Sequence, residues 1–134
     1  PLPDDEAAAM RAQVDVAYRM VRLMKETGVE IMAGTDTGDP YTVPGVTLQR
    51  ELELLVKAGL TPAQALETAT VIPARFLGWE ESMGTLKAGM VADLVVLDAN
   101  PLADIRNVSK VSGVAVRGRY LQRSQIRAIL DGVK

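Results

Sequence analysis

Residues 29–36 read Val-Glu-Ile-Met-Ala-Gly-Thr-Asp, and they decide the fold that the sequence predicts. Residues 29–33 are short and largely apolar and lie between Gly28 and Gly34, a pattern typical of a buried strand. Residues 5–27 carry apolar side chains at helical spacing, and Gly28 follows as a C-terminal stop. A helix, a glycine and a short apolar strand make one αβ unit of an α/β protein.

A loop is expected directly after this strand. Residues 35–46 contain glycines and prolines that break any regular pattern. The loop at the carboxyl end of a strand is where α/β proteins place their sites. Asp36 is therefore the main candidate for chemistry, since a carboxylate there can bind a metal ion or transfer a proton. The alternative is that Asp36 only caps a turn, because Thr, Asp and Gly all favour turns.

Further helices follow this loop. Residues 47–58 predict a second helix with a leucine face. Thr61 and Gln64 can form a capping box with a proline between them, and this combination predicts the start of a third helix. A short helical turn is expected from Pro73 to Gly78.

The remainder of the chain has a different character. Residues 84–121 are β-rich, with strands expected over 92–98, 111–116 and 119–121. A two-residue turn containing glycine joins the last two strands. The tail over residues 122–130 has an apolar face at helical spacing and predicts a final helix.

Composition limits the possible functions. The 134 residues include no His and no Cys and carry a net charge of -2 with both signs mixed, which gives no case for nucleic-acid binding. No apolar run is long enough to span a bilayer, so no membrane partner is expected. Without His, no serine can be part of a nucleophilic triad within this chain. The absence of Cys fits a reducing cytoplasm, but the location is otherwise unknown.

Other acidic residues are interpreted as structural. Asp93 and Asp98 flank an expected strand, where Asp is common in turns. Glu51 and Glu53 lie on the second helix beside its leucine face, and we expect them to be solvated. Three methionines are interpreted as core filler: Met20, Met24 and Met32.

Three passages, in this order and spacing, resemble the C-terminal part of the metal-dependent amidohydrolase superfamily. The similarity is to its imidazolonepropionase-like and Xaa-Pro dipeptidase-like branch. The first passage is residues 28–36, which end in Gly-Thr-Asp at Asp36. The second runs from the Pro-Gly pair at residue 44 through Arg-Glu-Leu to the Pro-Ala pair at residue 73. The third is residues 84–102, with Ala-Asp-Leu-Val-Val-Leu-Asp at its centre.

The resemblance implies an α/β fold: the C-terminal fragment of a (β/α)₈ barrel followed by a small β-rich part of a composite β-sandwich. Residues 1–80 would be the barrel segment, with residues 29–34 as the last barrel strand. Residues 81–121 would return to the sandwich, and residues 122–134 would form a C-terminal helix.

The resemblance also implies a reaction. Asp36 matches the family aspartate that binds a divalent metal, expected to be zinc, and carries the proton. The complete enzyme would hydrolyse a C–N bond in a small cyclic amide or dipeptide-like substrate by metal-activated water. The other family ligands, an HxH pair, a lysine and further histidines, are expected upstream of Pro1. Gln49 stands where relatives in this branch often have a histidine.

Two expectations follow for the chain by itself. One carboxylate cannot hold a catalytic metal, so the isolated chain is expected to be inactive. One strand cannot close a barrel, so the chain is expected to self-associate or to pack on the missing N-terminal part. The alternative is a non-enzymatic binding or assembly module derived from an amidohydrolase, which the absence of histidine favours.

Overall fold

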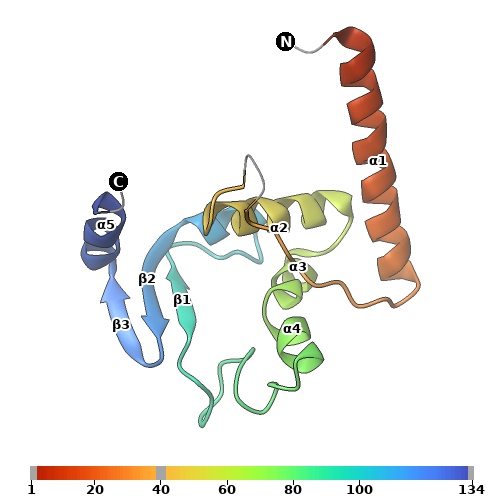
Figure 1. The fold of residues 1–134 in the computed structure, drawn as a ribbon. Coiled ribbons are helices and arrows are strands. Elements are labelled where there is room, and N and C mark those ends of the chain that lie inside the picture. Colours follow the sequence, from red (N-terminus) through yellow and green to blue (C-terminus); the bar gives the residue numbers. More distant parts are fainter. Residues whose placement is uncertain (1–2, 39–41, 133–134) are drawn as a thin grey trace.

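A computed structural model describes residues 3–38 and 42–132, and it combines helices with one antiparallel sheet. Figure 1 shows α2, α3 and α4 between α1 at one edge and the sheet with α5 at the other. In chain order the elements are α1 (Asp4–Glu26), α2 (Val46–Ala58), α3 (Pro62–Thr68), α4 (Val71–Phe76), β1 (Leu94–Leu97), the 3-10 helix η1 (Ile105–Ser109), β2 (Val111–Val116), β3 (Arg119–Gln122) and α5 (Arg123–Asp131).

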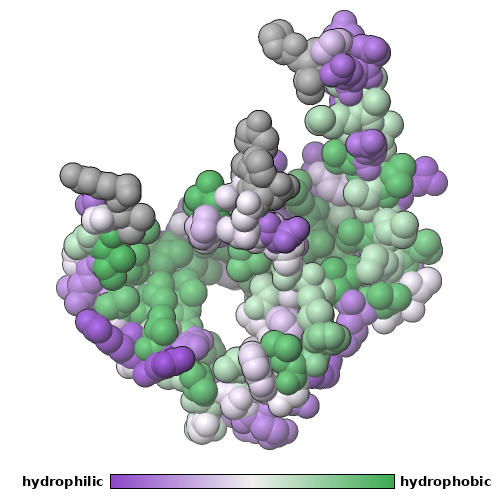
Figure 2. Space-filling view, viewed as in Figure 1, coloured by the Kyte–Doolittle hydropathy of each residue, from purple (hydrophilic) through white to green (hydrophobic). Residues whose placement is uncertain are grey.

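The long helix α1 ends as its sequence predicts. Gly28 adopts a φ of 75° and the backbone N–H of Val29 donates to the Met24 carbonyl at 2.9 Å, which closes the helix end. No described residue of α1 is buried, and Figure 2 shows green apolar surface along this helix. Met20 is 55% exposed and Met32, beyond the helix, is 42% exposed, so the interpretation of these two residues as core filler is wrong for the described chain.

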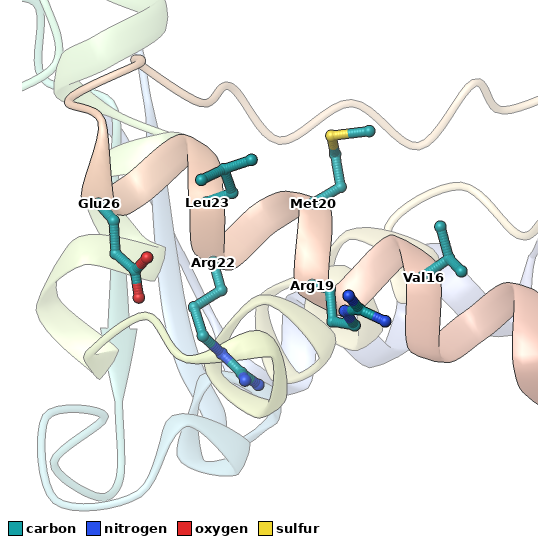
Figure 3. Close-up of a pocket in the computed structure, with 6 residues that line it drawn as sticks. All are labelled: Val16, Arg19, Met20, Arg22, Leu23 and Glu26. Carbon is teal, nitrogen blue, oxygen red and sulfur yellow. The ribbon is translucent and has the colours of Figure 1, made fainter.

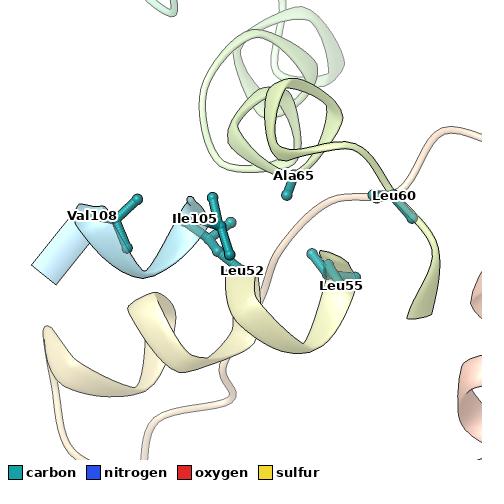
Figure 4. Packing of buried hydrophobic residues seen from close by; sticks show 6 residues of the cluster. All are labelled: Leu52, Leu55, Leu60, Ala65, Ile105 and Val108. Atoms are coloured by element: carbon teal, nitrogen blue, oxygen red, sulfur yellow. The ribbon is translucent and has the colours of Figure 1, made fainter. Parts of the chain in front are cut away.

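The core is built around α2. Leu52 and Leu55 are buried against Ala65 of α3 and against Ile105 and Val108 of η1, as Figure 4 shows. The leucine face predicted from the sequence therefore joins the helices to the β-rich part. The 3-10 helix that completes this core was not predicted, because five residues give too little periodicity to recognise.

The sheet has the order β1-β2-β3, and both pairings are antiparallel. Arg117 and Gly118 have φ angles of 50° and 79°, the paired positive values that a tight hairpin turn requires. Gly113 of β2 lies under Tyr120 of β3, where an added Cβ would come within 2.1 Å of the tyrosine hydroxyl. The expected strands at 111–116 and 119–121 are thus present, and the strand expected at 92–98 is shorter.

The strand expected over residues 29–33 is absent from the described chain. These residues are not assigned to any helix or strand, and Figure 1 shows them as an open trace that leads from α1 toward α2, called the extended segment below. A strand is completed by hydrogen bonds to a neighbouring strand. The three described strands all belong to the separate sheet in the C-terminal part of the chain. The strand predicted from the apolar pattern is therefore wrong for the described residues.

Removal of the α3 cap should destabilise the protein measurably. The Thr61 hydroxyl accepts the Gln64 backbone N–H at 3.2 Å and the Gln64 side chain accepts the Thr61 N–H at 2.9 Å, which confirms the predicted capping box. We expect Thr61→Ala to lower the free energy of unfolding by about 1 kcal/mol in urea titrations. Thr61→Ser, which keeps the hydroxyl, should lose much less. Equal losses in the two variants would contradict this role.

The start of η1 should depend on pH. Hydrogen bonds from the Arg106 side chain, and then from its backbone N–H, lower the pKa of Asp104 from its usual value of 3.8. Because the pKa is depressed in the folded state, this stabilisation is complete above pH 3.8 and is lost as pH falls through the folded pKa. Asp104→Ala should therefore destabilise the protein at pH 7, and the difference between the variant and the wild type should shrink as pH falls below 3.8. A destabilisation that does not change with pH would contradict this.

Candidate functional site

Asp36 lies at the end of the extended segment, and its side chain is exposed. Its φ of 47° is in the left-handed region, which Asp tolerates better than most residues at a cost of the order of 1 kcal/mol. The hydroxyls of Thr35 and Thr37 are 2.6 Å apart, so they close a turn with Asp36 between them. A tight turn thus presents this carboxylate at the surface.

Two hydrogen bonds anchor the backbone that leads to this turn. The N–H of Ala33 donates to the carbonyl of Thr68 at the end of α3, at 3.0 Å. The N–H of Gly34 donates to Glu51 Oε1 on α2, at 2.8 Å. Ile31 and Ala33 also pack against the buried cluster. The position of Asp36 is therefore set by α2 and α3 together.

Glu51 is not the solvated side chain that its place on the helix predicts. One carboxylate oxygen accepts from Gly34, and the other, Oε2, is buried without a hydrogen-bond partner among the described residues. It is the only such side-chain atom found in residues 3–38 and 42–132. Sequence reasoning missed this residue because helical periodicity separates apolar from polar faces and does not reveal a contact with residue 34.

The other acidic residues have structural partners. Asp93 accepts a hydrogen bond from the Arg117 backbone N–H at the hairpin, and Asp98 pairs with Arg123 at the start of α5. Their interpretation as strand-end residues agrees with these contacts. Glu53 pairs with Arg50 one turn earlier on α2.

The described residues do not by themselves form a metal site. No group of three or more His, Cys, Asp or Glu that could hold an ion occurs among them. The sequence has no His or Cys at any position. The turn at residues 34–37 therefore offers a metal ion one exposed carboxylate, that of Asp36. A catalytic metal takes at least three protein ligands, and Asp36 supplies one.

Two surface grooves of the described chain are lined by residues other than Asp36. Val16, Met20 and Leu23 line a shallow groove together with three charged residues, all on α1, as Figure 3 shows. A second groove lies between β2 and α5, and Gln49 of α2 reaches it. No helix within the described part of the chain is long and apolar enough to cross a membrane.

Comparisons with known proteins identify the family. Residues 8–121 match the profile of the amidohydrolase family. The chain is 33% identical over 101 residues to the ochratoxinase of Aspergillus niger, and the match covers 74% of this chain and 20% of that protein. It is 32% identical over 112 residues to the imidazolonepropionase of Symbiobacterium thermophilum, a match that covers 81% of this chain and 26% of that protein.

Solved structures agree with the sequence relatives. A structure assigned as a prolidase from Bifidobacterium longum superposes with a TM-score of 0.70 at 42% identity, over 83% of this chain and 29% of that one. A Xaa-Pro dipeptidase gives a TM-score of 0.72 at 30% identity, over 78% of this chain and 25% of that one.

These relatives are hydrolases, and members of the family generally use a divalent metal ion. The chain belongs to the amidohydrolase family. It spans between a fifth and a third of the length of the relatives compared above.

Proposed function

We propose that this chain is the C-terminal part of a metal-dependent amidohydrolase that hydrolyses a C–N bond in a small cyclic amide or dipeptide-like substrate. The observation that carries the proposal is the family match over residues 8–121, which includes Asp36 at the end of its anchored segment. The relatives compared above support the substrate classes, since they include an imidazolonepropionase and a Xaa-Pro dipeptidase.

In this proposal Asp36 acts with groups outside the chain. A zinc ion, when bound, supplies Lewis acidity and lowers the pKa of water. The carboxylate of Asp36 would be one of its ligands and would take up the proton released when water attacks the substrate carbonyl. It then passes the proton to the leaving nitrogen. Its exposed position in a turn supports this role, because substrate and solvent can both reach it.

The proposed organisation follows the same division as the resemblance. Residues 1–80 would complete a barrel, with 29–34 as its last strand. Residues 81–121 would complete a β-sandwich and 122–134 would end the chain as a helix. Exposed apolar side chains in both parts of the chain support this organisation. Val29 and Met32 of the extended segment are 50% and 42% exposed. Val95 and Val96 of β1 are 55% and 40% exposed. Such apolar surface requires cover.

The isolated 134-residue chain should therefore be catalytically silent and associated. We expect no hydrolysis of Xaa-Pro dipeptides or cyclic amides above background, even with added zinc. We also expect light scattering to report a mass above one chain, because the exposed apolar surface and open strand edges favour association. A monodisperse monomer with a cooperative melt would contradict the second expectation, and turnover by contaminant-free chain would contradict the first.

Asp36→Asn in the full-length protein should lower kcat by about a hundredfold or more on a substrate that the wild type hydrolyses. The reason is that an amide cannot take up and return the proton, a contribution of about 10²–10⁴ in rate. Steady-state kinetics and metal content, measured on the same preparations, check this prediction.

Glu80→Gln is the control, since it also removes a carboxylate but from an exposed loop. It should keep activity within about twofold of the wild type. If Asp36→Asn retained a comparable activity, the catalytic role would be wrong. A binding or assembly module derived from an amidohydrolase would then explain the chain better.

A further inference from the structure

The side chain of Glu51 connects α2 to the segment that carries Asp36 by accepting a hydrogen bond from the Gly34 N–H. Glu51 precedes Leu52, which is 5% exposed and anchors α2 in the core. The backbone at Glu51 is therefore fixed by packing. Its carboxylate reaches the N–H of Gly34, two residues before Asp36.

The environment of the carboxylate is unusual for a helix surface. Burial of a carboxylate oxygen without a partner opposes folding, and Oε2 is in this situation within the described chain. Residues that break a local rule in this way are concentrated at functional sites. A solvated glutamate, such as the one predicted from periodicity, would keep both oxygens in water.

The bond is placed where it can control the turn. Ala33 is already held by Thr68, so Gly34 is the last anchored backbone group before Asp36 adopts its left-handed conformation. The Gly34 N–H thus marks the boundary between the packed segment and the exposed turn. We expect loss of this acceptor to free residues 34–36 and to leave the core contacts of α2 unchanged.

We propose that Glu51 is a positioning residue that holds the Gly34-Thr35-Asp36 turn, and with it the Asp36 carboxylate, through its hydrogen bond to the Gly34 N–H. The expected effect of Glu51 on the reaction rate rests on the proposed hydrolase function. The expected effect of Glu51 on the conformation of the turn does not depend on that function. The hydrogen bond depends on the length of the side chain and not on its charge, because an uncharged acceptor of the same length can make the same bond.

The test uses hydrogen exchange by mass spectrometry on the full-length protein, with peptides that cover residues 30–38. Glu51→Ala and Glu51→Asp should raise amide exchange at Gly34 by about tenfold, since neither side chain reaches it. Glu51→Gln keeps the length and an acceptor oxygen, so its exchange should stay within about threefold of the wild type. Glu53→Ala, on the same helix, is the matched control and should leave the amide exchange of these peptides unchanged.

Activity gives the second readout. Misplacement of a reacting group by about 1 Å can cost a hundredfold in rate, so Glu51→Ala and Glu51→Asp should lower kcat by about tenfold to a hundredfold with KM nearly unchanged. Glu51→Gln should restore most of it. A positioning role thus predicts a nearly normal kcat for Glu51→Gln and a low kcat for Glu51→Asp. A role for the negative charge alone predicts the reverse order.

Several results would overturn the proposal. These are unchanged exchange at Gly34 in Glu51→Ala, an equal effect from Glu53→Ala, or a Gln variant as defective as Ala, including one that fails to fold. If only Glu51→Ala fails to fold, the comparison of Asp with Gln decides. If Asp36→Asn lost all activity while no Glu51 variant changed in exchange or activity, the role of Glu51 would be wrong and the hydrolase function would stand. If the Glu51 variants altered exchange at Gly34 while Asp36→Asn stayed active, the role of Glu51 in holding the turn would stand and the proposed catalytic function would be wrong.

Discussion

The packing of α2 is the interaction on which the rest of the structure depends. Its buried leucines, Leu52 and Leu55, hold α3 on one side and η1 on the other, so one helix joins the helical and β-rich parts. The same helix carries Glu51, which accepts the Gly34 N–H. The core therefore fixes the backbone of α2, α2 fixes Gly34, and Gly34 fixes the turn at Asp36. Apolar burial and the candidate site are linked by a single helix.

The extended segment supports the proposal that the chain is part of a larger unit. Residues 29–36 are tied by backbone donors at Ala33 and Gly34 and have no strand neighbour in the described chain. Parallel strands of α/β proteins are normally paired and covered on both faces. Val29 is instead half exposed, and α1 has no buried residue. The relatives supply a consistent explanation, since this chain spans less than a third of each of those compared.

Features encoded by local sequence could be predicted, and features that depend on distant contacts could not. The Thr61–Gln64 capping box, the Gly28 stop and the hairpin at Gly118 were all predicted, because each depends on neighbouring residues. Strand pairing at residues 29–33 was wrong, because pairing requires a partner that periodicity cannot supply. Asp36 was found as a candidate from its position after an apolar run. Glu51 was assigned to solvent, because its contact is with a residue 17 positions away.

The first measurement to make is the intact mass of the native polypeptide, purified from its source. We expect a chain several times longer than 134 residues, with room for the roughly 200 or more residues that a (β/α)₈ barrel needs. The additional sequence should contain the histidines that a metal site with Asp36 requires. A native mass of 14.4 kDa would contradict the account, because the missing ligands and strands would then have no source within the protein.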